Sequence, residues 1–138
     1  MSAPQDIPAP IVGARKLLVV MSDLLFRSKI DEVARRLGLE LRVAKSPEQL
    51  DRQLAAGEPA IAIVDLEETS LDPFAAIARV RAAASQTPIL GFSGHGNVDV
   101  IKRAREGGAT VLARSGFTVQ LPALLTQVAE RERARVAG

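Results

Sequence analysis

Ala60-Ile61-Ala62-Ile63-Val64-Asp65 is the stretch that decides the fold. Its five consecutive aliphatic residues indicate a strand that is buried on both faces, as in a parallel sheet covered by helices. Asp65 ends the apolar run, so a carboxylate is expected where this strand leaves the sheet. In open α/β sheets, ligands and chemistry gather at the carboxyl ends of the strands. Asp65 is therefore the first candidate functional residue.

On both sides of this strand, short apolar runs alternate with helical patterns. The other predicted strands are 17–20, 39–43, 88–92 and 109–113. The predicted helices are 24–37, one opened by Ser46 and Pro47, 72–84, one that ends at Glu106, and 119–135. Five strand–helix units in sequence predict an α/β fold, with a five-stranded parallel sheet and helices on both faces.

The domain organisation follows from length and from the proline positions. Residues 1–14 contain Pro4, Pro8 and Pro10 among alanines and are predicted to be a flexible lead-in. Residues 15–136 are predicted to form one domain that uses nearly the whole chain of 138 residues. No separate output domain fits beside it, so a stand-alone domain is expected.

Composition excludes several classes of site. The chain has no cysteine, which excludes disulfides, thiol catalysis and cysteine-bound metals. Its single histidine, His95, makes a histidine-rich zinc site improbable and is expected to be a surface residue of the loop 94–97. A net charge of +2 and an aromatic content of 3% argue against nucleic-acid binding.

Targeting signals are also missing from the pattern. The sequence begins without the basic and apolar regions of a secretory signal. No apolar run approaches the roughly 20 residues that a membrane-spanning helix needs. We therefore expect a cytoplasmic protein that does not bind membranes.

The order and spacing of these features resemble the receiver domain of response regulators, over residues from about 15 to 135. The marks are Leu17–Val20, Ile61–Leu66, Asp72, Pro88–Ser93, Ala104 with Glu106–Ala109, and Phe117. The resemblance implies a CheY-like, flavodoxin-like fold with strand order 2-1-3-4-5. It also implies a role in two-component or phosphorelay signal transduction.

The resemblance assigns roles to three residues of this chain. Asp65 matches the aspartate that accepts the phosphoryl group in the family. Ser93 matches the hydroxyl residue that ends the fourth strand and contacts the phosphoryl oxygen. Leu112 stands at the position of the switch aromatic in the fifth strand.

Other positions of the family pattern are degenerate. The acidic pair that helps to hold Mg²⁺ is replaced by Met21 and Ser22, and the lysine that follows the fifth strand is replaced by Ser115. A thioether is a poor ligand for a hard cation, and Mg²⁺ prefers carboxylate and water oxygens. Since phosphoryl transfer depends on charge neutralisation, two electrostatic supports of the reaction are lost.

Two kinds of replacement remain open. Asp23, Glu67 or Glu68 could supply a displaced carboxylate. Arg114 adjoins the lysine position, but strand alternation is expected to direct Arg114 and Ser115 to opposite faces. Arg114 could stand in for the lysine, and strand alternation is the argument against it.

Basic residues gather near the end of the chain. Lys102, Arg103, Arg105, Arg131, Arg133 and Arg135 interleave with Glu106, Glu130 and Glu132. The simplest interpretation is a solvated face. The resemblance adds a second one, in which the fourth helix, fifth strand and fifth helix bind an acidic protein partner or form a homodimer. Lys102, Arg103, Arg105 and Arg114 would line that face.

Three functions remain open. The first is a stand-alone, non-enzymatic pseudo-receiver that needs no cofactor and acts by phosphorylation-independent protein–protein interaction. The second is a working phosphoacceptor with Asp65 phosphorylated at an altered Mg²⁺ site. The third is a small-ligand binder that uses Ser22, Asp65 and Ser93 as polar contacts.

Overall fold

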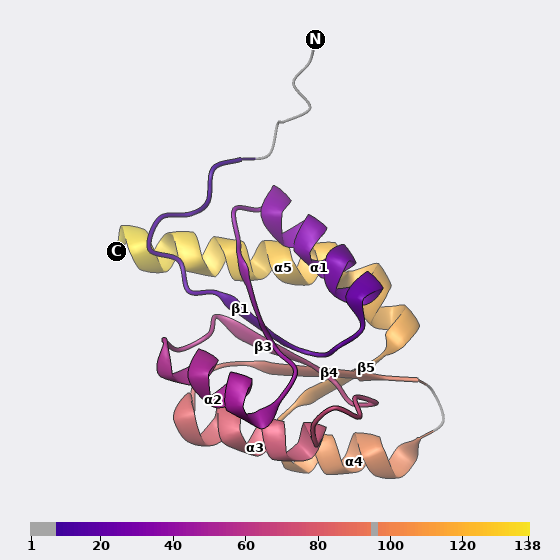
Figure 1. Ribbon diagram of the computed structural model, residues 1–138. Helices are drawn as coiled ribbons and strands as arrows, with labels where there is room; N and C mark the ends of the chain where they lie inside the picture. Colours follow the sequence, from indigo (N-terminus) through magenta and orange to yellow (C-terminus); the bar gives the residue numbers. More distant parts are fainter. Residues whose placement is uncertain (1–7, 95–96) are drawn as a thin grey trace.

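The structure is a computed structural model that describes residues 8–94 and 97–138 (Figure 1). Its strands are β1 (Leu17–Val20), β2 (Leu41–Ala44), β3 (Ile61–Asp65), β4 (Ile89–Ser93) and β5 (Thr110–Ala113). Its helices are α1 (Leu24–Arg36), α2 (Pro47–Ala55), α3 (Pro73–Ala83), α4 (Val98–Glu106) and α5 (Arg114–Ala137). The predicted alternation of strands and helices is confirmed.

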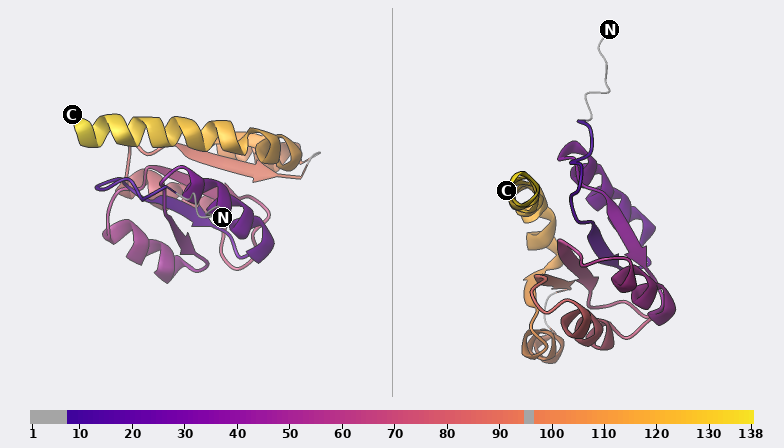
Figure 2. Two further views of the ribbon diagram at one scale, coloured as in Figure 1. Left: turned by 90° about the horizontal axis from the view of Figure 1, so that it is seen from above. Right: turned by 90° about the vertical axis from the view of Figure 1, so that its left-hand side faces the viewer.

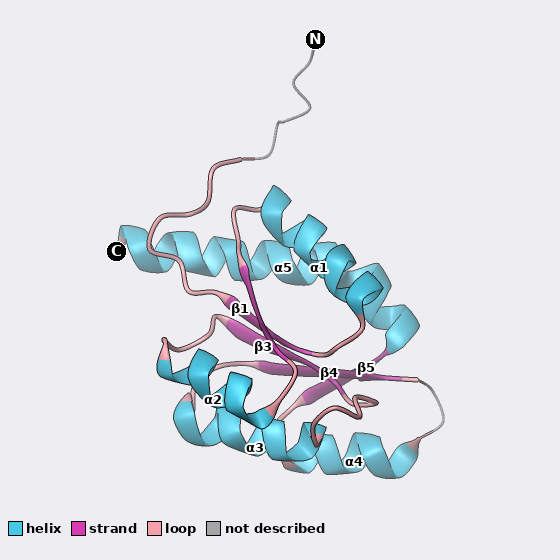
Figure 3. Ribbon diagram, in the orientation of Figure 1, coloured by secondary structure: helices cyan, strands magenta, loops and turns pink. Residues whose placement is uncertain are grey.

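All neighbouring strands pair in parallel, in the order β2-β1-β3-β4-β5. This is the predicted order, and it requires a crossover helix between successive strands. Helices α1 and α5 cover one face of the sheet, whereas α2, α3 and α4 cover the other (Figures 1 and 3). Because all strands are parallel, their carboxyl ends meet at one edge of the sheet, and the candidate site lies there.

Alternation along β1 divides the core into two layers. Leu17, Val19 and Met21 pack on the side of α1 and α5, while Leu18 and Val20 pack on the side of α2, α3 and α4. All five side chains are at most 1% exposed. A strand buried on both faces needs an unbroken apolar run, which explains why this run was visible in the sequence.

Two elements begin two or more residues away from their predicted starts, whereas the other predicted starts differ by at most one residue. Strand β2 begins at Leu41 rather than Leu39, because the Leu39 N–H bonds to the carbonyl of Ala34 and closes the end of α1. Helix α5 begins at Arg114 rather than Val119, directly after β5. Its first turn contains Gly116 and has no side-chain cap, so the usual sequence signals for a helix start are missing.

The predicted lead-in is described only from residue 8 onwards, and residues 1–7 lie outside the described part. Residues 8–14 form no helix or strand, but Ile11 is half-buried against the core and its N–H bonds to the carbonyl of Gly38 at 2.9 Å. Gly38 has a φ of 80°, a conformation that favours glycine. This segment passes the C-terminal part of α5 (Figure 2), where the Arg135 guanidinium donates a hydrogen bond to the carbonyl of Gly13. Among the described helices, none is long and apolar enough to cross a membrane.

Candidate functional site

The carboxyl edge of the sheet brings the predicted site residues together. Asp65 ends β3 and Ser93 ends β4, and the two side chains lie on adjacent paired strands. Asp65 is 6% exposed and Ser93 is 1% exposed. Met21 and Ser22 follow β1 at the same edge, and Ser115 lies in the first turn of α5. The edge therefore combines a buried pair, Asp65 and Ser93, with exposed polar residues around it, at the place where ligands bind in open parallel sheets.

Arg114 lies in this site, which corrects the expectation that it would turn away from it. Its Nη2 is 3.5 Å from Asp65 Oδ1 and 3.2 Å from Glu67 Oε1. The alternation argument was wrong because β5 ends at Ala113 and Arg114 already belongs to α5. A positive charge therefore faces Asp65, although the chain has Ser115 at the lysine position.

Glu67 connects two loops at the edge. Its Oε2 accepts a hydrogen bond from the Gly94 N–H at 2.8 Å, while its Oε1 accepts one from Arg114 at 3.2 Å. The Gly94 N–H, followed by Arg114, keeps the pKa of Glu67 below its ordinary value, against the effect of partial burial. The carboxylate thus joins the segment after β3, the segment after β4 and the start of α5.

The Asp65 carboxyl group experiences opposing effects. Burial raises its pKa above the ordinary value of 3.8. The Glu67 N–H, which donates to Oδ1 at 2.9 Å, and the Arg114 charge both oppose that rise. Burial is the larger influence, so the ionised form of Asp65 destabilises the folded state. Arg114 makes this destabilisation smaller.

Glu68 is a buried carboxylate whose acceptor sites are already used. Its oxygens accept hydrogen bonds from the N–H and hydroxyl of Ser22, from the N–H and hydroxyl of Ser70, and from the Thr69 N–H. Burial alone would raise the pKa of Glu68, but the bonds from Ser70 and Ser22 lower it from 4.5 to about 2. Glu68 thus reaches Ser22, which the resemblance places at an acidic-pair position, but its oxygens are all engaged by protein donors.

An aromatic cluster supports the site from the α1 side. The rings of Phe26, Phe92 and Phe117 contact one another with centroid separations of 4.8, 5.6 and 4.9 Å. The Arg114 guanidinium lies over it, 5.2 Å from the Phe26 ring and 4.9 Å from the Phe92 ring. Cation–π contact of this kind holds a guanidinium in a fixed place. Phe26 was not among the predicted site residues, and its place on the exposed start of a helix gave no signal.

The remaining predicted positions differ in environment. Met21 is fully buried in the core, Leu112 is half-buried against the same core, and Ser115 is exposed. Among the described residues, none meets the distance and angle of a hydrogen bond to the buried Ser93 Oγ, although this hydroxyl is near enough to Glu67 to help lower the pKa of that carboxyl group. A buried hydroxyl without a partner is uncommon and marks a place where a polar group from elsewhere would fit.

The donor set does not fit the divalent cation that the fold family implies. Met21 offers no oxygen and lies in the core, while the Ser22 hydroxyl already donates to Glu68. Within the described ranges, no group of three acidic or histidine side chains has the arrangement of a metal site. His95 lies outside the described residues. Arg114 already neutralises the two free carboxylates, Asp65 and Glu67.

The basic residues of the predicted partner face are divided between two places. Lys102, Arg103 and Arg105 are exposed on α4, and the Arg103 guanidinium lies 4.2 Å from the centre of the Phe74 ring. Arg114, which the prediction placed with them, points instead to Asp65. Glu106 beside them is exposed, as expected for a solvated face.

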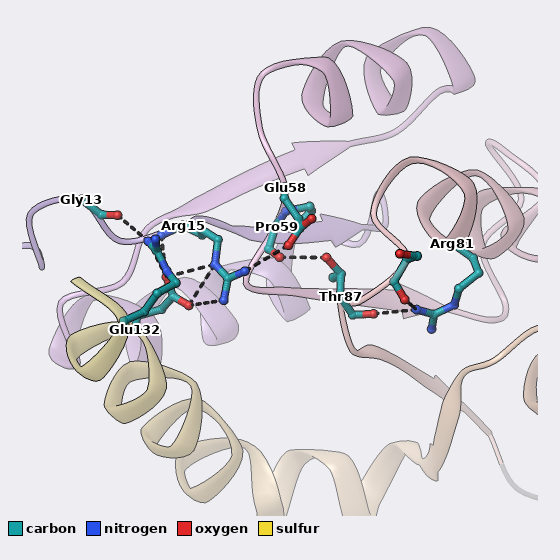
Figure 4. Close-up of polar contacts among 9 residues, drawn as sticks. Gly13, Arg15, Glu58, Pro59, Arg81, Thr87 and Glu132 are labelled. Atoms are coloured by element: carbon teal, nitrogen blue, oxygen red, sulfur yellow. Dashed lines mark hydrogen bonds and ion pairs between the residues drawn. The ribbon is translucent and has the colours of Figure 1, made fainter. Parts of the chain in front are cut away.

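Glu132 corrects the prediction of a solvated face on α5. Its side chain is 1% exposed and pairs with Arg15, whose Nη2 lies 2.7 Å from Oε2 (Figure 4). Arg135 also donates to Glu132, at 3.2 Å, and to the carbonyl of Gly13, at 2.6 Å. Although burial opposes ionisation, the hydrogen bonds from Arg15 lower the pKa of Glu132 below its ordinary value. Helical spacing alone could not reveal this pair, because Arg15 lies far away in the sequence.

Solved structures with the same fold are response regulator receiver domains. A signal receiver domain from Colwellia psychrerythraea is 20% identical, with a TM-score of 0.71, and the match covers 84% of this chain and 98% of that chain. A CheY-like receiver domain from Methanospirillum hungatei is 10% identical, with a TM-score of 0.73 and coverage of 89% and 99%. A Burkholderia pseudomallei response regulator with a phosphorylated aspartic acid is 21% identical, with a TM-score of 0.71 and coverage of 89% and 73%.

These matches establish the fold. No protein-family model and no curated protein matches the sequence. The chain has the receiver-domain, CheY-like fold with five parallel strands in the order 2-1-3-4-5. At such low identities the chemistry of the site has to be argued from its own residues.

Proposed function

We propose that this protein is a pseudo-receiver, a signalling module of the receiver fold that acts by binding a protein partner without being phosphorylated. The ion pair between Arg114 and Asp65, with 3.5 Å between Nη2 and Oδ1, carries the proposal. A cation of the protein itself already pairs with Asp65, the carboxylate that would have to bind both the metal and the phosphoryl group. It neutralises the carboxylates rather than leaving them to hold a metal.

The state of Glu68 supports the same conclusion. A carboxylate could restore the missing acidic pair only if its oxygens were free to bind a cation. Those of Glu68 accept hydrogen bonds from Ser22, Thr69 and Ser70 instead. Transfer to Asp65 would then lack the metal that stabilises the transferred group.

The partner surface in this proposal lies on α4. Lys102 and Arg105 border a surface depression that also contains the apolar side chains of Val98 and Ile101. Val98 is 73% exposed, which is high for an aliphatic side chain. A protein with acidic residues around an apolar contact, or a second copy of the chain, would suit this surface, in a cytoplasmic setting.

A titration followed by amide NMR tests the proposal. Mg²⁺ and then beryllofluoride, which imitates a phosphoryl group, are added to the native protein and to Asp65→Asn. We expect no saturable shifts at Asp65, Ser93 or α4 in either protein at millimolar Mg²⁺. Saturable shifts in the native protein that are absent from the variant would overturn the proposal.

One observation favours a second candidate, a working phosphoacceptor at Asp65. The buried Ser93 Oγ, at the end of the strand paired with β3, has no geometric hydrogen-bond partner among the described residues and could donate to a phosphoryl oxygen. In this candidate Arg114 supplies the positive charge of the lost lysine, and Mg²⁺ binds at an altered site. Incubation with a small phosphodonor and Mg²⁺ would then add one phosphoryl group by mass spectrometry, and Asp65→Asn would abolish the addition.

A further inference from the structure

We infer that the Arg114 guanidinium is the resident counter-cation of Asp65 and Glu67, and that it holds the carboxyl edge in one arrangement that needs no metal. The inference rests on the proposed function, because it explains how the site stays ordered without a metal or a phosphoryl group. It adds a regulation of that site, since metal binding should be suppressed by a side chain of the same molecule.

The position of the guanidinium supports this role. Nη2 lies 3.5 Å from Asp65 Oδ1 and 3.2 Å from Glu67 Oε1, so one nitrogen faces both carboxylates. Two carboxylates this close to a common point repel each other unless a cation lies between them. In this structure the cation is covalently attached to α5, and no ion has to be taken from solution.

The surroundings of Arg114 explain why it stays in place. The guanidinium packs over the rings of Phe26 and Phe92, and its side chain is 34% exposed. A planar guanidinium stacks on aromatic rings better than an ammonium group does. Arginine therefore suits this position better than lysine would.

The ion pair also reaches a loop. Glu67 Oε2 accepts the hydrogen bond from the Gly94 N–H at 2.8 Å, so Arg114 fixes the carboxylate that ties the segment after β4. Gly94 allows this approach, since a Cβ at residue 94 would lie 2.8 Å from that oxygen. Loss of Arg114 should thus loosen Gly94 and leave Asp65 and Glu67 as an uncompensated carboxylate pair.

The test compares three full-length proteins: native, Arg114→Gln and Arg79→Gln. Arg79 is the matched control because its guanidinium pairs with a single exposed aspartate, Asp51, at 2.6 Å. Mn²⁺ is titrated into each protein, and local broadening of amide NMR signals reports where it binds. We expect Arg114→Gln to bind Mn²⁺ at residues 65–67 about tenfold more tightly than the native protein. Arg79→Gln should behave like the native protein.

A double variant identifies the ligands. Arg114→Gln combined with Glu67→Gln should lose the gained affinity, because one of the two carboxylates is removed. A folded Arg114→Gln protein that binds no more Mn²⁺ than the native protein would overturn the inference alone. Tight Mn²⁺ binding by the native protein at residues 65–67 would overturn both the inference and the proposed function.

Amide exchange gives a second readout. If Arg114→Gln does not fold, Arg114→Lys provides the test instead. Lysine keeps the positive charge but cannot stack on the aromatic rings as a guanidinium does. The inference requires faster hydrogen exchange of the Gly94 amide in Arg114→Lys than in the native protein. Unchanged exchange there would contradict it.

Discussion

Three hydrogen bonds join Ser22 to Glu68, although 46 residues separate them in the chain. The Ser22 N–H donates to Oε1 at 2.6 Å, and the Ser22 hydroxyl lies 3.0 and 2.9 Å from the two oxygens. A second carboxylate at residue 22 would repel Glu68, whereas a serine supplies a donor. Serine at residue 22 thus lets the loop after β3 close onto the end of β1.

This contact predicts how the stability of the protein depends on pH. Glu68 has its pKa lowered from 4.5 to about 2 on folding, so its contribution is fully present above pH 4.5 and is lost as the pH falls toward 2. Glu68→Gln should lower the free energy of unfolding at pH 7 by about 3 kcal/mol. Urea unfolding at pH 7 and at pH 3 measures this effect.

The same experiment has a clear negative outcome. The loss caused by Glu68→Gln should be smaller at pH 3 than at pH 7, because at pH 3 Glu68 is almost fully protonated in the unfolded chain. Glu48→Gln, at an exposed glutamate of α2, serves as a control and should change stability little at either pH. An equal loss at both pH values would contradict the assigned pKa.

Asp65→Asn should change stability in the opposite direction. Burial raises the pKa of Asp65 above 3.8, so the folded state carries its charge at a cost near neutral pH. The variant should therefore have a higher unfolding midpoint than the native protein at pH 7. The stability difference between Asp65→Asn and the native protein should disappear as the pH falls below 3.8, because Asp65 is then protonated in both the folded and the unfolded state. A lower midpoint at pH 7 would show that the Arg114 pair outweighs burial.

The phenylalanine cluster should contribute much of the core stability at the site. Phe92 is 0% exposed and stacks on Phe117 with a centroid separation of 4.9 Å. Phe92→Ala should lower the free energy of unfolding by about 3–5 kcal/mol, because it leaves a cavity in a packed core. Phe74→Ala, at a half-buried ring under Arg103, should cost clearly less in the same denaturant series.

The pair of Arg15 and Glu132 should tie the start of the domain to α5. Glu132→Gln should lower the free energy of unfolding by about 2 kcal/mol, since charge-assisted hydrogen bonds to a buried carboxylate are lost. Arg15 also pairs with Glu58, whose side chain is 44% exposed. Glu58→Gln should therefore lower the free energy of unfolding by at most about 1 kcal/mol. Equal effects in thermal or urea unfolding would contradict the assigned burial.

The sequence predicted strands and helix starts correctly where a local structural requirement selects a particular type of residue. Strands buried on both faces need unbroken aliphatic runs, and Ala60–Val64 and Leu17–Val20 show them directly. Ser46 and Asp72 cap the helices that follow them, as local hydrogen bonding requires. The start of α5 was missed, because Arg114 and Gly116 carry no capping signal.

The sequence by itself determined the alternation of buried strands and helices and placed Asp65 and Ser93 at strand ends, because burial on both faces requires unbroken apolar runs. The strand order was predicted from the resemblance to receiver domains, and the structure confirms it. Only the tertiary structure decided the chemistry of that edge. Arg114 reaches Asp65, Ser22 reaches Glu68 and Arg15 reaches Glu132 across long stretches of chain. Such pairs depend on where a side chain points after packing, and neither spacing nor residue type specifies that direction.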